Sequence, residues 1–569
     1  MKNVKLVSIL ERFTSSKLNE LIGDENLEIM QEWESKEKID SLKKSDLAKI
    51  VYNIYGDKLI DDEKNRFEIL EHLNKDEYEE ISKKLNKKVD YKEIKEIYSS
   101  KNWKNDIYTK VLLELLEINE SVFDISKEDK SINILKSNNG LSKFYELQDY
   151  QFLIKQKVMN RLNKNHEIEK MLINMPTGTG KTKTCMHIIT DAIINILKNK
   201  GLVIWIADTS ELLEQAYSTF KNVWSHIGNQ DIKSYKLYGK YNFECNDIED
   251  GIVFAGIQKL NSMKNKKDLL FDKLVNESIL IVYDEAHKIV AYETKKTVEE
   301  LMLKKNENKN KILIGLSATP GRTGDRKEID KLVNFFNNNK FEIDIKTLNK
   351  INMSDFEYSN AKTIGIISYL QNRKILSLLK KEELEYLPID INDWNTLVEK
   401  IRKSDKEISK SNLEKFAKEK SRNKAIIEKL LMLNEKKIPT LVFACSVEHA
   451  KLIANILTIK GVNNTLILGE TETEKRINEI ENFKNGEVNI LINCNVLTTG
   501  FDATNIECVF ITRPTKSIIL YSQMIGRGLR GPKMGGSEEC LLIDLKDNLQ
   551  NAEEVESFSY FNKFWNGGK

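Results

Sequence analysis

The sequence predicts an α/β protein in which two tandem parallel-sheet lobes follow an all-helical N-terminal domain. Two observations lead to this fold class. Short apolar runs alternate with helical patterns in two separate sets, which span residues 202–316 and 440–543. Continuous apolar runs of this kind are typical of parallel strands that helices cover on both faces. Before residue 140, in contrast, the apolar residues recur at helical spacing and no proline occurs.

The same pattern divides the 569 residues into five predicted parts. These are a helical accessory domain at 1–139, a first lobe at 140–335, a helical linker or insertion at 336–420, a second lobe at 421–549 and a C-terminal tail at 550–569. The third part is rich in Lys, Asn and Glu, and its apolar residues follow a mostly helical pattern.

Composition narrows the possible functions. The 89 Lys and Arg residues nearly balance the 87 Asp and Glu residues, so any nucleic-acid site must be a local groove rather than a general basic field. No apolar run is long enough to span a membrane, and the first residues lack a signal-peptide core, so we expect a cytoplasmic protein. The six cysteines lie far apart, which indicates core residues rather than a zinc site or disulfides.

A glycine-rich loop, Met-Pro-Thr-Gly-Thr-Gly-Lys-Thr at 175–182, lies between an apolar run and a helical pattern. Strand, loop and helix in this order predict a phosphate-binding loop, although its strict pattern has Gly where Met175 stands. The glycines let backbone N–H groups close around phosphate oxygens. Lys181 should reach the β- and γ-phosphates of ATP, and the Thr182 hydroxyl should hold Mg²⁺. The residues expected around the nucleotide are Thr177, Gly178, Thr179, Gly180, Lys181 and Thr182.

Two adjacent carboxylates, Asp284 and Glu285, follow directly after the apolar run at 279–283. At the end of a strand they suit a Mg·ATP site, where Asp284 would hold Mg²⁺ and Glu285 would orient or deprotonate the attacking water. An acidic helix start is the alternative interpretation. The position after a phosphate loop favours the catalytic interpretation.

These motifs belong to a longer series that resembles the superfamily 2 helicases of the DEAH type, over roughly residues 140–548. The series comprises Leu147-Gln148-Asp149-Tyr150-Gln151, Ser210-Glu211-Leu212, Gly256-Ile257-Gln258, Asp284-Glu285-Ala286-His287, Ser317-Ala318-Thr319, Thr498-Thr499-Gly500-Phe501-Asp502 and Gln523-Met524-Ile525-Gly526-Arg527-Gly528-Leu529-Arg530. Each string alone is a weak signal, but their number and order are specific. The resemblance implies two RecA-like lobes and ATP hydrolysis that depends on nucleic acid.

The resemblance also implies roles for further residues. Gln151 would contact adenine, and Gly500 and Asp502 would contribute to the nucleotide site. The residues expected to contact nucleic acid are Ser210, Gly256, Gln258 and Thr499, although the family usually has Thr where Gly256 stands. The residues expected to couple hydrolysis to lobe movement are His287, Ser317 and Thr319.

Cations from the second lobe should complete the catalytic set, which includes Gln523. Hydrolysis of ATP develops charge on the γ-phosphate that Lys181 and Mg²⁺ only partly neutralise. Arg527 and Arg530 are three residues apart on a predicted helix and so share one face. Arginine stays charged and binds phosphate with two nitrogens. We expect Arg530 to be the arginine finger, with Arg527 as the alternative.

The residues of the last motif favour DNA as the nucleic acid. Gln523-Met524 stands where RNA helicases of the DEAD-box kind usually carry His-Arg, and the motif resembles those of DNA-repair helicases and restriction-enzyme motor subunits. The predicted function is an ATPase that translocates on or unwinds DNA, as the motor of a bacterial anti-phage or repair system. The alternatives are an RNA helicase or remodeller, and an ATP-gated switch that recruits a partner nuclease. Because no nuclease signature occurs, we expect a partner protein to dock on residues 1–139, and contact with DNA through the Lys-rich surfaces of this domain is the alternative.

Overall fold

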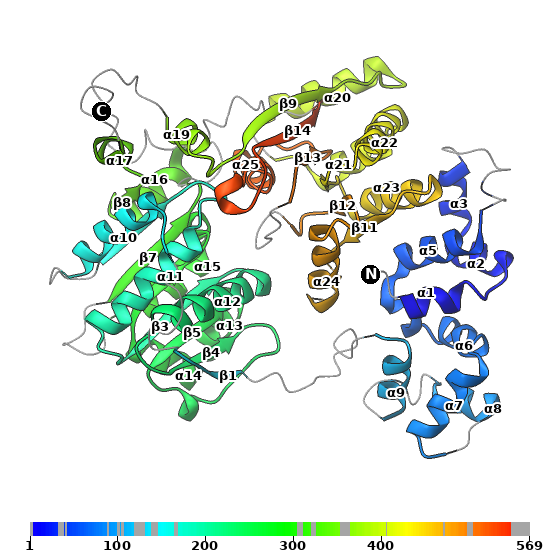
Figure 1. The fold of residues 1–569 in the computed structure, drawn as a ribbon, viewed down its shortest axis with the longest axis horizontal. Helices are drawn as coiled ribbons and strands as arrows, with labels where there is room; N and C mark the ends of the chain where they lie inside the picture. The colour runs from blue at the N-terminus through cyan, green and yellow to red at the C-terminus, as the bar shows by residue number, and fades with distance from the viewer. Residues whose placement is uncertain are drawn as a thin grey trace.

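The computed structural model contains a helical domain and two α/β lobes (Figure 1). It describes residues 4–31, 39, 42–87, 90–99, 103, 107–118, 131–137, 146–163, 169–303, 311–319, 326–352, 365–404, 407–469, 471, 473–497 and 505–547. The second lobe lies between the helical domain and the first lobe (Figure 1). Within these residues, no helix is long and apolar enough to cross a membrane.

The first lobe contains an eight-stranded sheet in the order β1-β4-β5-β3-β6-β7-β2-β8. All neighbouring strands are parallel except β1 and β4. The strands are β1 (Ile132–Leu135), β2 (Glu169–Asn174), β3 (Leu202–Ala207), β4 (Ile232–Leu237), β5 (Gly251–Gly256), β6 (Ser278–Tyr283), β7 (Ile312–Ser317) and β8 (Lys340–Glu342). The helices are α10 (Asp149–Leu162), α11 (Lys181–Asp191), α12 (Ser210–Ile227), α13 (Ile257–Lys266), α14 (Leu269–Glu277), α15 (Tyr292–Leu301), α16 (Arg326–Phe335) and α17 (Ile345–Asn352).

Apolar cores lie on both faces of this sheet, as the continuous apolar runs predict. Strand β3 is buried along its whole length. The side chains of Trp205 and Trp224 are fully buried, which confirms their interpretation as core residues.

The second lobe contains a six-stranded parallel sheet in the order β11-β12-β10-β13-β14-β9. The strands are β9 (Leu378–Leu384), β10 (Thr440–Phe443), β11 (Asn464–Ile467), β12 (Ile490–Asn493), β13 (Cys508–Ile511) and β14 (Glu539–Leu545). The helices are α20 (Ile391–Lys403), α21 (Lys410–Lys418), α22 (Lys420–Glu435), α23 (Val447–Ile459), α24 (Thr473–Lys484) and α25 (Ile518–Ile525). The predicted class, two tandem parallel-sheet lobes behind a helical region, is therefore confirmed.

The N-terminal domain is helical and packs on the second lobe. Its helices are α1 (Val4–Leu10), α2 (Ser15–Ile22), α3 (Asp24–Gln31), α5 (Lys44–Tyr55), α6 (Glu63–Glu71), α7 (Lys75–Lys84), α8 (Tyr91–Ile97) and α9 (Ile107–Leu115). Helix α5 contacts α23. The Asn53 amide donates to Asn455 Oδ1 at 3.1 Å, and Lys451 Nζ donates to the Ile54 carbonyl at 3.0 Å. Ile459 of the second lobe also joins the core of the helical domain. The domain therefore shares a buried interface with the second lobe.

Three strands lie in ranges that the sequence predicts to be helical. Strand β1 falls within 1–139 and pairs with β4, and strands β8 and β9 fall within 336–420. Strand β9 reads Leu-Leu-Lys-Lys-Glu-Glu-Leu and lies at the edge of the second sheet. Charged side chains are common on edge strands because one side is not paired. Strand β9 therefore lacks the apolar run that marks an inner strand. The helical prediction is wrong for the segments that form β1, β8 and β9.

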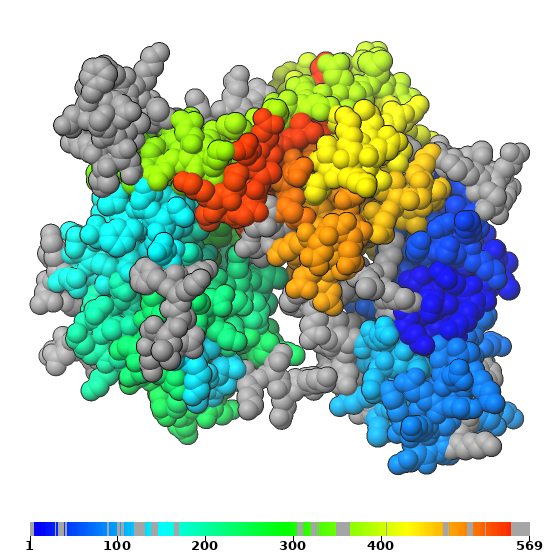
Figure 2. Space-filling view, in the orientation of Figure 1, coloured from blue at the N-terminus to red at the C-terminus, as the bar shows by residue number. Residues whose placement is uncertain are grey.

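The two lobes touch along the last part of the second lobe. Figure 2 shows the red surface of this part against the cyan surface of α10 and the green surface that precedes β9. Tyr369, Leu370, Ile375 and Leu376 of that preceding segment, which includes α19 (Ile366–Asn372), lie in the core of the first lobe. The connection between the lobes is thus packed into the first lobe before it enters the second sheet.

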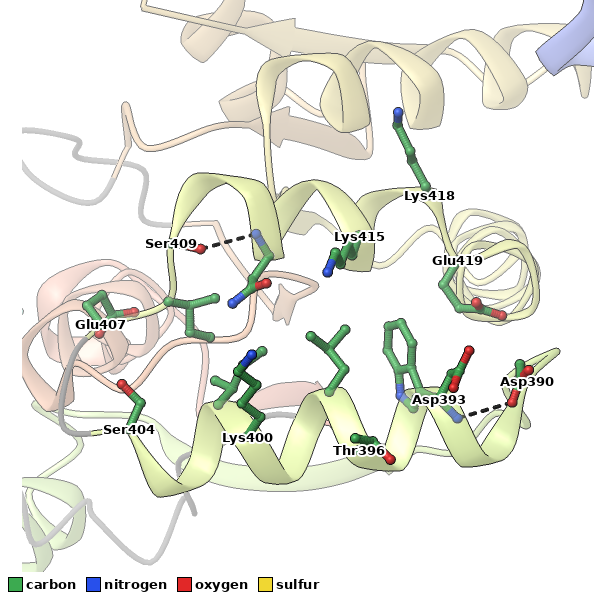
Figure 3. A pocket seen from close by; sticks show the side chains of 15 residues that line it. Asp390, Asp393, Thr396, Lys400, Ser404, Glu407, Ser409, Lys415, Lys418 and Glu419 are labelled. Atoms are coloured by element: carbon green, nitrogen blue, oxygen red, sulfur yellow. Dashed lines mark hydrogen bonds between the residues drawn. The ribbon is translucent and has the colours of Figure 1, made fainter.

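Helices α20 and α21 enclose a groove of about 810 Å³ (Figure 3). Its lining mixes acidic and basic side chains, such as Asp393 and Lys400, above apolar residues that include Leu397 and Ile401. Those apolar residues belong to a small core that α20 and α21 share with Cys445 of the second lobe. No residue predicted for the functional site lines this groove.

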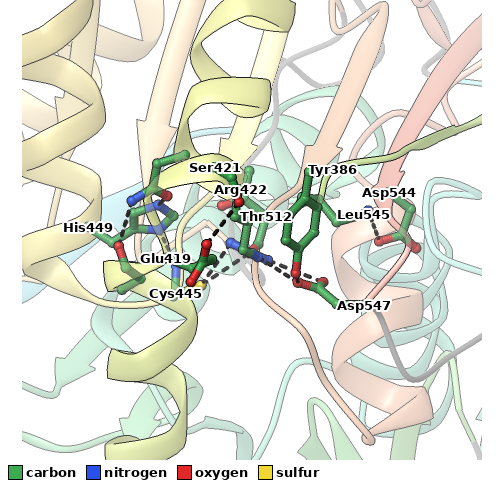
Figure 4. Close-up of polar contacts among 12 residues, drawn as sticks. Tyr386, Glu419, Ser421, Arg422, Cys445, His449, Thr512, Asp544, Leu545 and Asp547 are labelled. Atoms are coloured by element: carbon green, nitrogen blue, oxygen red, sulfur yellow. Dashed lines mark hydrogen bonds and ion pairs between the residues drawn. The ribbon is translucent and has the colours of Figure 1, made fainter. Parts of the chain in front are cut away.

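A buried ion pair joins strand ends in the second lobe (Figure 4). The Arg422 side chain is fully buried, and its Nε lies 2.6 Å from Asp547 Oδ2. Arg422 Nη2 donates to the Thr512 carbonyl at 2.6 Å, and the Tyr386 hydroxyl donates to Asp547 at 2.6 Å. Because these residues follow β9, β13 and β14, the pair fixes the carboxyl ends of three strands against α22.

Candidate ATP site between the lobes

The phosphate loop connects β2 to α11, as the sequence predicts. Gly178 and Gly180 adopt left-handed φ angles of 82° and 78°. A Cβ at Gly180 would lie 2.4 Å from Gln151 Nε2, so only glycine fits there without displacing that amide. The Thr179 hydroxyl closes the turn by donating to the Pro176 carbonyl at 2.6 Å. These contacts leave a preformed loop at the start of α11 that suits phosphate oxygens.

Gln151 and Tyr150 support the loop from α10. The Gln151 amide donates to the Thr179 carbonyl at 2.8 Å, and the Tyr150 hydroxyl donates to the same carbonyl at 2.9 Å. Gln151 Oε1 accepts from the Gln148 backbone N–H at 2.9 Å. The structure thus places Gln151 against the phosphate loop, while its contact with adenine stays a prediction.

Lys181 and the two adjacent carboxylates form one electrostatic cluster. Burial lowers the pKa of Lys181, and the positive charge of Arg527 lowers it further. The carboxylates of Glu285 and Asp284 oppose this shift. Burial and the neighbouring Glu285 raise the pKa of Asp284. Burial also works to raise the pKa of Glu285, but His287 and Lys181 outweigh it and lower that pKa. The cluster therefore contains a lysine, two carboxylates and an arginine from the other lobe.

The backbone of Glu285 takes the left-handed conformation, with φ 52° and ψ 51°. Such a conformation is strained for a residue with a side chain and is often found at functional sites. Here it turns the chain sharply between the end of β6 and the short helix at Ala286–Lys288.

The three residues predicted to couple hydrolysis to movement lie together. His287 Nδ1 lies 3.4 Å from Glu285 Oε2 and 3.5 Å from Ser317 Oγ. Ser317 Oγ donates to the Thr319 carbonyl at 2.7 Å and accepts from the Thr319 N–H at 3.1 Å. A continuous chain of polar contacts thus runs from Glu285 to the segment that leaves β7.

Both arginines of the last motif lie at the phosphate loop, but not on a helix. Helix α25 ends at Ile525, and Arg527 and Arg530 follow it in a turn and a short bridge to Leu376. The prediction that they share a helix face is therefore wrong, because glycines on both sides of Arg527 end the helix. Arg527 is 8% exposed. A Cβ at Gly178 would lie 3.7 Å from Arg530 Cγ, so Arg530 packs against the loop.

Gln523 and Gly526 of the same motif occupy different surroundings. Gln523 is partly exposed on α25. A Cβ at Gly526 would lie 2.5 Å from Thr177 Cγ2, which places Thr177 of the phosphate loop directly on the second lobe. The two lobes are therefore in contact at the candidate site.

The residues predicted to contact nucleic acid in the first lobe lie at neighbouring strand ends. Ser210 is exposed at the start of α12, and Gly256 is buried at the end of β5. Gln258 donates to the Asp208 carbonyl at 2.9 Å, which joins the ends of β3 and β5. Thr499, Gly500 and Asp502 lie outside the described residues.

Several contacts at the site had no signal in the sequence. Arg373, just before β9, pairs with Asp149 of α10 and donates to the Tyr369 hydroxyl at 2.6 Å. Arg476 of α24 pairs with Glu211 of α12 and so joins the two lobes. The partners in these ion pairs are hundreds of residues apart, and single charged residues in charged surroundings do not predict such pairs.

The fold and the site define the class of protein. Two parallel-sheet lobes, a phosphate loop on the first and arginines of the second beside it are the arrangement of an ATP-dependent helicase. Residues 144–322 match the family described as "Type III restriction enzyme, res subunit", and residues 421–531 match "Helicase conserved C-terminal domain". The chain belongs to the superfamily 2 helicases, which confirms the resemblance.

Known proteins with similar sequences include two yeast helicases. The "Putative ATP-dependent helicase IRC3" of Saccharomyces cerevisiae is 27% identical over 406 residues, which are 70% of this chain and 51% of the relative. The "Putative mitochondrial ATP-dependent helicase irc3" of Schizosaccharomyces pombe is 26% identical over 67% of this chain and 54% of the relative. This chain thus spans about half the length of each. Among solved structures, the Pyrococcus furiosus Hef helicase domain is 17% identical, with a TM-score of 0.42 over 73% of this chain and 98% of that chain.

Proposed function

We propose that this protein is an ATPase that depends on nucleic acid and uses hydrolysis to translocate on or unwind DNA. One observation carries the proposal, namely that the phosphate loop of the first lobe, which contains Lys181, lies against Gly526 and Arg530 of the second. Charge that develops on a γ-phosphate at this contact would meet cations from both lobes. Hydrolysis is therefore linked to the contact between the lobes.

The residues of the site fit Mg²⁺ as well as ATP. The Thr182 hydroxyl and the Asp284 carboxylate are oxygen donors of the kind that Mg²⁺ prefers. Burial and the neighbouring Glu285 raise the pKa of Asp284, and a cation bound there would oppose this shift. Thr182 and Asp284 would hold the ion, which would neutralise phosphate charge when bound.

Each remaining residue of the cluster has a distinct role in the proposed reaction. Lys181 binds the β- and γ-phosphates. Glu285 stays ionised because its pKa is lowered, so it orients the attacking water and is a weak proton acceptor. Arg530, with Arg527 beside it, stabilises the charge that develops on the γ-phosphate. Gln523, Gln151, Gly500 and Asp502 complete the proposed nucleotide site.

For the nucleic acid, we favour a path over Ser210, Gly256, Gln258 and Thr499. Contacts to backbone phosphates there would give little sequence preference and a strong dependence on salt. The wording of the last motif and the family description of a restriction-enzyme subunit support DNA. RNA is the second candidate, since the DEAD-box ATP-dependent RNA helicase 35A of Oryza sativa is 33% identical over 137 residues, 23% of this chain.

The N-terminal domain suits a partner protein better than it suits DNA. Residues 1–139 contain 25 Lys and Arg against 30 Asp and Glu, a net charge of −5. A domain that grips DNA usually has a basic excess. A partner docked there, such as a nuclease in a cytoplasmic anti-phage or repair system, would be held next to the second lobe. An ATP-gated switch that recruits this partner remains the alternative to a motor.

One experiment tests these proposals together. The ATPase rate is measured with single-stranded DNA, duplex DNA, forked DNA and RNA, with Glu285→Gln as the inactive control. Stimulation by DNA above that by RNA supports the first proposal, and the reverse order supports the second. An ATPase rate that none of these nucleic acids changes would refute the proposal of a motor and leave the ATP-gated switch as the remaining alternative.

A further inference from the structure

The connection between the lobes holds the segment that carries Arg530. Residues 374–378 run beside residues 529–537, and we call these two segments the clip. The Ser377 N–H donates to the Leu529 carbonyl at 3.1 Å, and the Gly531 N–H donates to the Ile375 carbonyl at 2.9 Å. The Lys533 N–H donates to the Lys374 carbonyl at 3.0 Å. The backbone around Arg530 is therefore fixed to the connection rather than to α25.

The clip lies directly on the phosphate loop. A Cβ at Gly178 would lie 3.5 Å from Leu376 Cδ2 and 3.7 Å from Arg530 Cγ. A Cβ at Gly180 would lie 3.8 Å from Met534 Cε. Leu376 is 1% exposed and belongs to the core of the first lobe. The segment that bears Arg530 is thus held in place by the lobe that bears the phosphate loop.

Ser377 occupies the centre of the clip. Its side chain is fully buried, and its hydroxyl lies 2.7 Å from the Arg530 carbonyl and 2.8 Å from the Ser537 carbonyl. The hydroxyl has one hydrogen, which these two carbonyl oxygens share, and a buried carbonyl oxygen that loses its hydrogen-bond donor is costly. The hydroxyl thereby sets the direction in which the chain passes through Arg530.

We propose that Ser377 is a positioning residue for ATP hydrolysis, which acts by fixing the backbone of Arg530 against the phosphate loop. This inference rests on the proposed function, in which Arg530 stabilises charge on the γ-phosphate. A cation stabilises a transition state only when its position is set before the reaction. A displacement of about 1 Å in such a group can lower the rate by roughly 10²-fold.

The test compares four variants by nucleic-acid-stimulated ATP hydrolysis: Ser377→Ala, Arg530→Ala, the double variant and Ser234→Ala. Ser234 is a matched control, because it is fully buried and donates to the Asn133 carbonyl at 3.2 Å, on the edge strand pair β1–β4. We expect Ser377→Ala to lower kcat about tenfold or more while KM for ATP changes less than about threefold. The double variant should be no slower than Arg530→Ala, because Ser377 acts through Arg530.

Each other outcome has a defined meaning. A Ser377→Ala protein with the kcat of Ser234→Ala overturns the inference, and so does a double variant slower than Arg530→Ala by the full Ser377→Ala factor. If Ser377→Ala does not fold, Gly531→Ala replaces it, because a Cβ there would lie 2.5 Å from the Lys374 carbonyl and open the clip. Normal hydrolysis in Arg530→Ala overturns the inference together with the role proposed for Arg530, whereas a wild-type protein without stimulated hydrolysis refutes the proposed function as a whole.

Discussion

Acid should destabilise the second lobe through one histidine, His449 on α23. His449 is 1% exposed. Its Nδ1 accepts from the Cys445 N–H at 3.2 Å, so the proton of the neutral ring is on Nε2, which donates to Asn423 Oδ1 at 2.9 Å. Burial, together with the nearby charge of Arg422, lowers the pKa of His449 to about 3. The folded protein therefore keeps this ring neutral.

The sign and size of the effect follow from this pKa. An exposed histidine in the unfolded chain has a pKa near 6.5, so below that value the unfolded state binds the proton more tightly than the folded state. The stability that neutral His449 contributes is complete above pH 6.5 and is lost as the pH falls toward 3. About 2 kcal/mol should be lost by pH 5, and ~5 kcal/mol over the whole range.

Hydrogen exchange of the β10 and β13 amides at pH 7 and pH 5, corrected for intrinsic exchange rates, measures this loss locally. The comparison is between the wild type, His449→Gln and a His226→Gln control, whose replaced ring is only partly buried. We expect His449→Gln to lower stability at pH 7 but to flatten the change between the two pH values. An equal change in all three proteins would refute the reasoning.

Three further predictions concern the site and the helical domain. Lys181→Ala should abolish hydrolysis and weaken ATP binding, whereas Glu285→Gln should bind ATP and nucleic acid but not turn over; nucleotide titration and steady-state rates separate the two. Arg530→Ala should lower kcat by about 10³-fold with ATP affinity changed only a few-fold, the pattern of a contact made in the transition state. Deleting residues 1–118 should leave ATP binding intact, destabilise the second lobe by exposing Ile459, and leave the salt dependence of DNA binding unchanged; a shallower salt slope would mean that the deleted domain contacts phosphates.

Much of the fold is visible in the sequence because its signals are local. The apolar runs of the inner strands are continuous, and the phosphate loop and the Asp284-Glu285 pair each lie within a few consecutive residues. The motif that contains Arg527 and Arg530 is local as well. The path of the chain after α25 cannot be predicted from it. Gly526 and Gly528 within this motif are signs in the sequence that the helix ends there.

The features that escaped prediction depend on contacts between distant parts of the chain. Strand β9 is stabilised by β14 and carries no apolar run. Arg422 and Asp547 are 125 residues apart, and nothing near either residue predicts a buried ion pair. Ser377 likewise looks like an ordinary polar residue until its carbonyl partners are known. Such residues derive their roles from topology rather than from local pattern.

The shared interface between α5 and α23 joins the N-terminal domain to the second lobe. Because Asn53, Asn455 and Ile459 are buried between the two bodies, the domain would follow any rotation of the second lobe against the first. In the proposed motor the domain would then act as a lever arm, whose displacement grows with distance from the pivot. A partner protein bound to the outer helices would therefore travel farther in each cycle than any atom at the proposed site of hydrolysis.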